Sequence, residues 1–334
     1  MIHRTAPVFQ PLWKTELANA ISSPVELLQL LDLQETSLTQ ELDISPDFRL
    51  RVPRGFVAKM KKGDPDDPLL RQILPLAKEN IDLTGYLSDP VGDLNAEVVA
   101  GVLHKYQGRA LLVTTGACGV HCRYCFRRHF PYGDSNPSAG QWQQALQYIR
   151  KTTSINEVIL SGGDPLSLTD QKLAALVTKI DQIPHIKRLR IHTRMPVILP
   201  ERIDTHLLDW INSIHLKTIM VIHANHANEI DTKVSDAMAE LSNNGITLLN
   251  QSVLLRGVND SSESLIMLSE RLFDIGVLPY YLHLLDPVRG AAHFDIDRHQ
   301  AAGIMEKVRD QLPGYLVPKL VWEKAGANSK ITII

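Results

Sequence analysis

The second two thirds of the chain alternate between two hydrophobic patterns. Short runs of apolar and β-branched residues indicate buried strands, and between them apolar residues recur at the one-turn spacing of amphipathic helices. The expected strands are Arg109–Thr115, Glu157–Ser161, Leu189–Thr193, Thr218–His223, Thr247–Val253 and Tyr280–Leu285. Strands that alternate with helices predict a parallel sheet with βαβ crossovers, so we expect an α/β fold.

The pattern does not by itself choose between a doubly wound sheet and a full or partial barrel. Leu173, Leu176 and Ile180 predict one helix face, and later helices are expected to stop before Gly245 and Gly276. No G-x-G-x-x-G motif follows the first strand, which makes a dinucleotide-binding sheet less favoured.

Residues 1–100 show a different pattern, with short apolar runs punctuated by proline. Ser23 and Pro24 predict one helix start, Pro53 predicts a helix that ends at Gly63, and Asp67 is expected to cap a third. We interpret residues 1–100 as a helical segment that packs on a catalytic barrel at 101–334. No chemistry is visible in this segment.

Composition narrows the class of protein. The 334 residues are 44% hydrophobic and carry a formal net charge of −2, which argues against binding nucleic acid through bulk charge. No long apolar run predicts a membrane span, and no apolar leader follows the N-terminus. Three clustered cysteines suit a reducing compartment, so we expect a soluble, cytoplasmic protein without membrane or nucleic-acid partners.

The strongest chemical signal is the run C-G-V-H-C-R-Y-C, which holds Cys118, Cys122 and Cys125. Three thiolates on one loop can bind a metal centre and leave one coordination position open. One alternative is a zinc site completed by His121 or His129. Structural zinc usually takes ligands from two separated pairs, so a [4Fe–4S] cluster with one iron free of cysteine fits this spacing better.

A resemblance to a known family extends this interpretation. The loop C-x3-C-x2-C after the first strand resembles the radical S-adenosylmethionine (SAM) superfamily, which folds as a partial (β/α)6 barrel. Further blocks resemble lysine 2,3-aminomutases, and two N-terminal blocks resemble the short branch that supplies (R)-β-lysine for modification of elongation factor P. These blocks are H-K-Y-x-x-R-A-L-L, C-R-Y-C-F-R-R-H-F-P-Y, S-G-G-D-P-L, R-I-H-T-R-M-P, H-A-N-H-A-N-E-I, N-Q-S-V-L-L-R-G-V-N-D, P-Y-Y-L-H-L-L-D, L-R-V-P-R-G-F and G-D-P-D-D-P-L-L-R-Q.

The resemblance implies three cofactors: a [4Fe–4S] cluster, SAM and pyridoxal 5′-phosphate (PLP). It assigns PLP to Lys330, with Arg109 and Lys105 at the phosphate, although Lys105 replaces an arginine of the family. The positions that match SAM contacts are Ser161, Gly162, Gly163, Asp164, His223 and Gln251. The competing interpretations are an ordinary βα turn for the glycine pair and a structural role for His223.

The resemblance also implies the substrate and the reaction. Arg127 matches the arginine that pairs with the carboxylate of lysine, and Asp286 and Glu323 match the two acids that hold its ε-ammonium. The implied reaction converts (S)-α-lysine to (R)-β-lysine, with an electron from flavodoxin or ferredoxin and a functional link to the ligase that modifies elongation factor P. The alternatives are an aminomutase for another amino acid, such as glutamate, and a zinc-binding interaction module.

Overall fold

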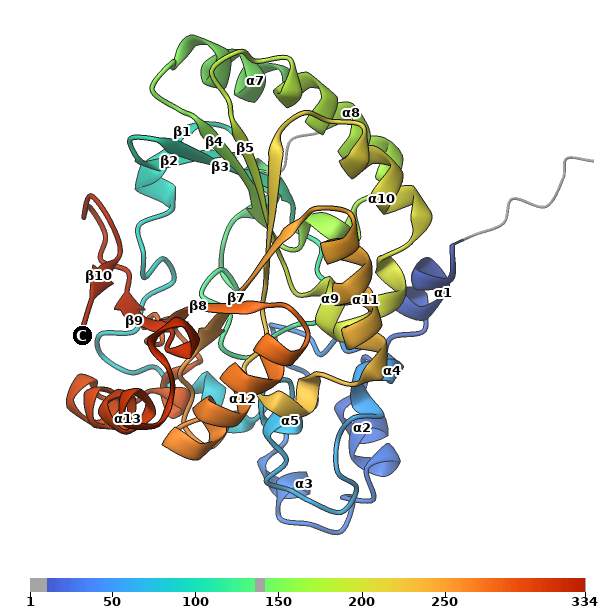
Figure 1. Ribbon diagram of the computed structural model, residues 1–334. Coiled ribbons are helices and arrows are strands. Elements are labelled where there is room, and N and C mark those ends of the chain that lie inside the picture. Colours follow the sequence, from blue (N-terminus) through green and yellow to red (C-terminus); the bar gives the residue numbers. More distant parts are fainter. Residues whose placement is uncertain (1–10, 136–141, 334) are drawn as a thin grey trace, which may run out of the picture.

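The computed structural model describes residues 11–135 and 142–333, and its strands form one sheet in which each strand pairs with the next along the chain (Figure 1). The strands are β1 (Glu97–Val99), β2 (Val102–Tyr106), β3 (Arg109–Thr115), β4 (Glu157–Gly162), β5 (Arg188–Thr193), β6 (Lys217–Ile222), β7 (Thr247–Val253), β8 (Leu278–His283), β9 (Lys319–Trp322) and β10 (Ile331–Thr332). Neighbours from β3 to β9 run parallel, whereas β1, β2 and β10 pair antiparallel. Among the described residues β1 does not pair with β10, so the sheet curves into an open, partial barrel.

The six strands expected from the sequence are present within two residues of their predicted bounds. The four strands that were not expected, β1, β2, β9 and β10, have between two and five residues each. The addition of β9 extends the six-stranded parallel pattern by one more parallel strand. This strand ends one residue before Glu323, which lines the cavity.

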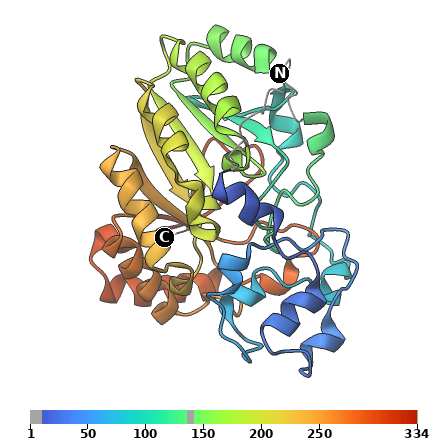
Figure 2. The same cartoon turned by 90° about the vertical axis from the view of Figure 1, so that its right-hand side faces the viewer.

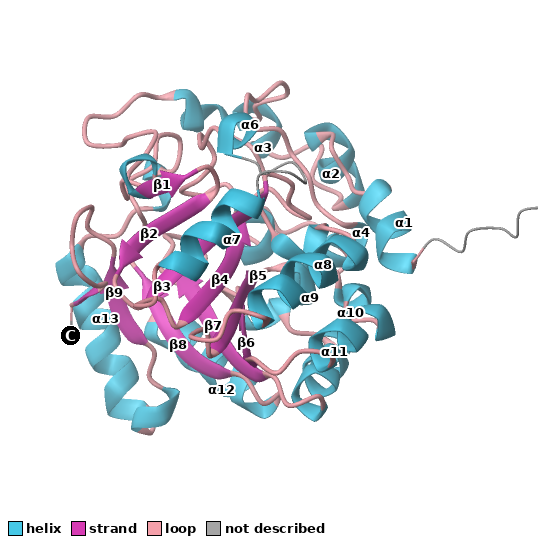
Figure 3. Cartoon of the chain, turned by 90° about the horizontal axis from the view of Figure 1, so that it is seen from above, coloured by secondary structure: helices cyan, strands magenta, loops and turns pink. Residues whose placement is uncertain are grey.

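Helices cover the outer face of the sheet (Figure 3). The helices after β3 are α6 (Tyr132–Ser135), α7 (Trp142–Lys151), α8 (Asp170–Asp181), α9 (Met195–Ile198), α10 (Thr205–Asn212), α11 (Thr232–Asn243), α12 (Ser262–Asp274) and α13 (Arg298–Gln311). The predicted face of α8 is confirmed, because Leu173, Leu176 and Ile180 are each 0% exposed. Gly245 and Gly276 follow α11 and α12 with φ of 73° and 75°, a conformation that glycine adopts without a steric penalty.

The N-terminal segment contains α1 (Leu12–Ala18), α2 (Pro24–Leu30), α3 (Leu38–Glu41), α4 (Arg54–Val57) and α5 (Pro68–Arg71). The caps of α2 and α5 are confirmed: Ser23 Oγ accepts from the Glu26 N–H, and Asp67 accepts from two N–H groups of α5. The helix after Pro53 was predicted to run to Gly63, which is wrong. It ends at Val57, and Gly63 instead donates its N–H to the Leu31 carbonyl at 2.7 Å.

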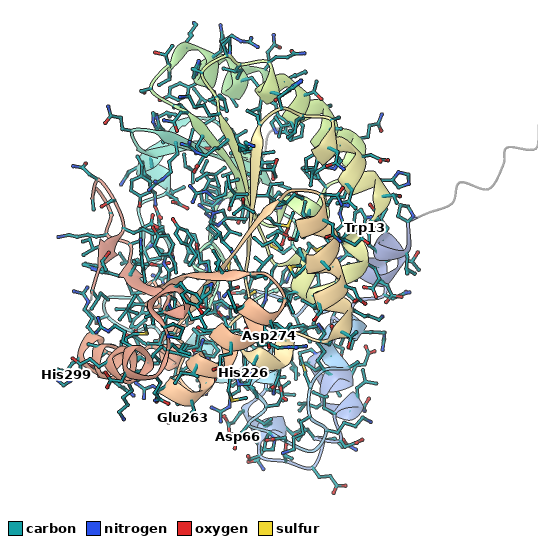
Figure 4. The ribbon with its side chains drawn as sticks, viewed as in Figure 1. Trp13, Asp66, His226, Glu263, Asp274 and His299 are labelled. Atoms are coloured by element: carbon teal, nitrogen blue, oxygen red, sulfur yellow. The ribbon has the colours of Figure 1, made fainter. Side chains whose placement is uncertain are left out.

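This segment lies against the barrel and shares its core (Figure 2). Trp13 of α1 is 2% exposed and lies where α1 meets the helices of the barrel, with the Arg202 guanidinium 4.6 Å from its ring (Figure 4). Lys59 of the segment donates from Nζ to the backbone carbonyl of Glu229 at 2.8 Å, and Glu229 follows β6 in the barrel. Apolar residues of the segment and of the barrel belong to one continuous hydrophobic cluster. Within the described ranges, no helix combines the length and apolarity that a membrane crossing needs.

Candidate active site

Every site residue proposed from the sequence lines one cavity inside the barrel, and most of these residues lie at or after the carboxyl ends of the parallel strands. This cavity has a volume of about 460 Å³. The cysteine loop after β3 and the end of β4 form part of its wall. Residues of β5, β7 and β8, and the residues that directly follow β6 and β9, form other parts. Lys330 enters the cavity from the turn that precedes β10. This is the end of a β/α barrel at which active sites are built.

The three cysteines lie on the loop between β3 and α6. Cys118, Cys122 and Cys125 are free thiols, and each contributes to the cavity wall. Burial raises the pKa of Cys118 well above its ordinary value, and burial with repulsion from Cys122 raises the pKa of Cys125 to about 11. Bound metal cations supply the positive charge that stabilises thiolates in such a setting. The donor set therefore fits a metal cluster.

The histidines near this loop have partners in the protein. His121 Nδ1 lies 2.7 Å from the Arg49 carbonyl, and His129 Nε2 lies 3.2 Å from the Arg289 carbonyl. Within the described part of the chain, no three His, Cys, Asp or Glu side chains converge on a position for a single metal ion. In a [4Fe–4S] cluster each cysteine binds a different iron, so the three cysteines do not have to meet at one point.

The arginines of the cysteine loop are buried and paired. Arg123 and Arg128 donate to the same carboxylate, that of Glu79, with Nη2–Oε2 distances of 2.5 and 2.8 Å. Arg123 is 1% exposed. These arginines therefore do not form a solvated charged face. These ion pairs attach the loop to the N-terminal segment.

The glycine pair after β4 allows close contact with the cysteine loop. Gly162 has φ of 120°, and a Cβ on Gly163 would lie 2.4 Å from the Ala117 carbonyl oxygen. The Gly163 N–H donates to the Thr115 carbonyl at 2.7 Å. Asp164 lines the cavity, but its carboxylate accepts bonds from the Thr193 hydroxyl and the Arg194 N–H, both at 2.7 Å. Its side chain therefore fixes the end of β5, and the backbone N–H groups of Gly163 and Asp164 bind the cysteine loop and the end of β3.

A chain of alternating charges crosses the cavity wall. Asp93 is 2% exposed and bridges Arg127 and Lys105, with N–O distances of 2.6 Å to each. Glu323 bridges Lys105 and Lys330, with N–O distances of 2.8 Å to each. Burial opposes ionisation of Glu323, but Lys330 and Lys105 outweigh burial and lower its pKa to about 2. The chain places Arg127 at one end and Lys330 at the other.

Asp286 lies beside this chain but outside it. Among the described residues, no side chain forms a hydrogen bond or an ion pair with its carboxylate. Burial and the neighbouring Glu323 raise the pKa of Asp286 from 3.8 to about 7, although Lys330 and Lys105 favour its ionised form. A cationic ligand group next to Asp286 would supply the missing partner.

Three histidines form the inner wall of the cavity. His192, His223 and His283 come from β5, the residue after β6 and β8, and the Nε2 atom of each is buried without a hydrogen-bond partner. Burial holds the pKa of His223 at about 4 and those of the other two well below 6.5. The three rings are therefore neutral and have unused hydrogen-bonding capacity. Gln251 on β7 lines the same region.

Arginines mark the part of the cavity nearest the amino ends of the strands. Arg109, at the start of β3, stacks its guanidinium 4.3 Å from the Tyr106 ring and has no carboxylate partner in the described structure. Arg190 on β5 also lines the cavity and pairs with Glu157. Lys105 is engaged by Asp93 and Glu323, so Arg109 is the cation here that is most available to an anion.

Several lining residues were not identified from the sequence. Asp93 belongs to the N-terminal segment, where no chemistry was expected, yet it lines the cavity and pairs with Arg127. His192, Arg194 and His283 lie in motifs that carried the family resemblance, but an isolated histidine or arginine in a strand gives no signal of its own. Asp93 follows Gly92 in a loop without helical or strand pattern, so only the fold places it beside Arg127.

An open β/α barrel with three cysteines after its first parallel strand defines the radical SAM class, and the Radical SAM superfamily model matches residues 112–268. L-lysine 2,3-aminomutase of Escherichia coli (strain K12) is 49% identical over 319 residues, which cover 95% of this chain and 93% of that protein. L-lysine 2,3-aminomutase of Haemophilus influenzae is 48% identical over 318 residues, covering 95% and 94%. In structure, a radical SAM methyltransferase from Sphaerobacter thermophilus aligns with a TM-score of 0.46 and 16% identity over 66% of this chain and 68% of that chain. The chain belongs to the lysine 2,3-aminomutase family.

The cofactors of this family are a [4Fe–4S] cluster, SAM and PLP. The residues present fit these groups, because the cavity offers three thiols, three unpartnered histidine nitrogens, an unpaired arginine and a lysine within one enclosed space. The predicted fold class and the family resemblance are confirmed. The role of each site residue remains a prediction.

Proposed function

We propose that this protein is a lysine 2,3-aminomutase that converts (S)-α-lysine to (R)-β-lysine. The observation that carries the proposal is the convergence of the cysteine loop, Lys330 and Asp286 on one cavity of about 460 Å³. The bound cluster and SAM supply a carbon-centred radical, and PLP supplies the conjugation that lets an amino nitrogen move between adjacent carbons. The protein contributes binding, orientation and the exclusion of water.

The cavity wall carries complementary charges for the two ends of lysine. Arg127 donates hydrogen bonds from Nε to the Asp93 carboxylate and from Nη1 to the Ser161 hydroxyl. Its Nη2 atom has no hydrogen-bond partner in the described structure. A guanidinium edge fixed in this way can bind the substrate carboxylate. Asp286 and Glu323 provide two carboxylates for the distal ammonium, which relieves their mutual repulsion.

This electrostatic arrangement favours lysine over the alternative substrate. Glutamate would place a carboxylate against Asp286 and Glu323, where burial and the charge of Glu323 already raise the pKa of Asp286. The zinc-binding module is disfavoured because it gives no reason for Lys330 and an acid pair to share a cavity with the cysteines.

We extend the proposal to the setting of the reaction. A flavodoxin or ferredoxin delivers the electron, the product passes to the ligase that modifies elongation factor P, and the enzyme works in the cytoplasm. The resemblance of the N-terminal blocks to the short branch supports the link to elongation factor P. Intact mass measurement of elongation factor P, incubated with ligase and product, tests this link.

The central test is anaerobic reconstitution with iron and sulfide, followed by lysine, SAM, PLP and a reductant. We expect a brown iron–sulfur chromophore and β-lysine as the product, with chirality assigned after derivatisation. Loss of both would overturn the proposal. Turnover of glutamate in preference to lysine would reassign the substrate within the same family.

A further inference from the structure

Arg194 connects the cysteine loop with a buried polar network. It follows β5 directly, and its side chain is 5% exposed. Its Nη1 atom donates to the Cys122 sulfur at 2.8 Å and to the Tyr124 hydroxyl, also at 2.8 Å. Arg194 thus brings a positive charge and an N–H group to the sulfur of an expected cluster ligand.

The position of this guanidinium does not depend on the cysteine. Its Nη2 atom donates to Gln72 Oε1 at 2.6 Å and to Glu229 Oε2 at 3.0 Å. Gln72 and Glu229 are each 0% exposed, and Gln72 Nε2 donates to Glu229 Oε1 at 3.0 Å. The Asn225 N–H also donates to Glu229, at 2.9 Å. Because these bonds hold the arginine from the opposite side, its Nη1 is directed at the sulfur before any metal binds.

The N-terminal segment takes part in this arrangement through Gln72. Besides binding Arg194 and Glu229, Gln72 accepts the Arg123 backbone N–H at 2.9 Å with its carbonyl. One residue of the segment therefore fixes both the backbone of the cysteine loop and the arginine at its central cysteine. A segment that only covered the barrel would not need a buried glutamine at this point.

Hydrogen bonds to cysteine sulfur are among the factors that set the reduction potential of an iron–sulfur cluster. An N–H donor draws negative charge from the sulfur, which stabilises the reduced cluster because that form carries one more electron. A buried guanidinium acts in the same direction. We propose that Arg194, held by Gln72 and Glu229, is a positioning residue that raises the reduction potential of the cluster through an N–H···S bond to Cys122. This inference rests on the proposed function in that it assumes a cluster at the three cysteines.

The test is an EPR-monitored redox titration of reconstituted protein without SAM, with dithionite as the source of the single electron. Arg194→Met removes the donor and the charge, and Arg194→Lys keeps the charge but loses the planar fork. We expect both variants to have a lower midpoint potential than the wild type. Each tenfold decrease in the equilibrium constant for one-electron reduction of the cluster lowers this potential by about 59 mV. The control is Arg202→Lys, at an arginine that is 0% exposed and bound to Asp170 away from the cysteines.

An Arg194→Lys variant with the wild-type potential and intact cluster would overturn the proposal. If neither Arg194 variant holds a cluster, the test uses wild-type protein with ¹⁵N-labelled arginine. Pulsed EPR of its reduced cluster should then show coupling to a guanidinium nitrogen. Absence of that coupling contradicts the proposal. These outcomes are separate from the proposed function, since an unchanged potential together with β-lysine formation refutes only the role of Arg194. Failure of the wild-type protein to hold any cluster refutes both.

Discussion

Lys330 and Glu323 face each other across the turn between β9 and β10, with Nζ 2.8 Å from Oε2. The ion pair holds the lysine side chain in the cavity, where 19% of it is exposed. Glu323 is also proposed to bind the distal ammonium of the substrate. The same carboxylate can therefore hold either the protein's own amine or that of lysine, at one point in the site.

The first prediction concerns the residue that binds PLP. We expect borohydride reduction of the PLP-loaded protein to attach PLP to Lys330 alone, because this amine lies inside the cavity. Lys330→Ala should abolish the attachment and leave the cluster chromophore intact. Mass spectrometry of the modified peptide is the measurement, and Lys324→Ala, at an exposed neighbour, is the control. Label on Lys105 instead would refute the assignment.

The second prediction follows from the pKa of Asp286, which is raised to about 7. Only the ionised carboxylate binds an ammonium, so lysine affinity should increase as the pH rises through about 7 and fall by up to about tenfold per unit below it. Asp286→Asn should weaken binding and remove this pH dependence. Calorimetric titration with lysine between about pH 6 and about pH 8 measures both effects. Retention of the pH dependence in the variant would contradict the prediction.

The same pKa has an opposite effect on stability. Since the folded protein holds the Asp286 proton more tightly than the unfolded chain, ionisation costs stability as the pH rises from 3.8 to about 7. Asp286→Asn should therefore raise the melting temperature of the protein without substrate at about pH 8, with a smaller gain at about pH 6. Glu240→Gln, at an exposed position on α11, should change neither value.

The third prediction addresses the phosphate of PLP. Arg109 has no carboxylate partner among the described residues, so its charge is free to bind the phosphate. Arg109→Met should therefore weaken the free energy of PLP binding by about 1.5–3 kcal/mol, the range for a hydrogen bond to a charged group. This corresponds to roughly ten- to hundredfold weaker PLP binding, measured by absorbance. Arg188→Met, at a half-exposed arginine paired with Glu157 outside the cavity lining, is the matched control. Equal PLP affinity in both variants would exclude Arg109 from the phosphate site.

The fourth prediction concerns the glycine pair after β4. A Cβ at Gly163 would lie 2.4 Å from the Ala117 carbonyl oxygen, which no rotamer change can relieve. Gly163→Ala should therefore displace the cysteine loop and lower the iron content after reconstitution. Gly303→Ala on α13 meets nothing within 4 Å and should stabilise the helix by about 0.5–1 kcal/mol. Normal iron content in Gly163→Ala would show that this contact is not required.

The sequence was sufficient for the parts of the fold that repeat a strong pattern. Strands β3 to β8 are long, apolar and flanked by amphipathic helices, so their periodicity could be read directly. Strands β1, β2, β9 and β10 are short and pair mainly as hairpins, and their stability comes from neighbours that periodicity does not reveal. The helix after Pro53 ends at Val57, and Gly63 bonds to Leu31, a contact that depends on the tertiary structure.

In the site, too, the residues in specific motifs could be predicted from the sequence, and those that depend on tertiary contacts could not. Cys118 and the other residues in specific motifs were identified from the sequence, and the cavity brings them together. Asp93 and Gln72 were missed because a buried acid and a buried amide acquire their roles only from partners far along the chain. The partners of Asp93 include Arg127, and those of Gln72 include Arg194 and Glu229.

The strand order of the sheet also fixes the order in which the site is completed during synthesis. A nascent chain that has emerged as far as β8 contains the cysteine loop, the glycine turn and all three wall histidines, but not Glu323 or Lys330. The groups proposed to capture PLP and the distal amine are made last, and they take their places only when β9 and β10 join the sheet. Early release from the ribosome would thus yield a chain with the cluster loop and Arg127 but without the groups proposed for PLP attachment and for the distal ammonium.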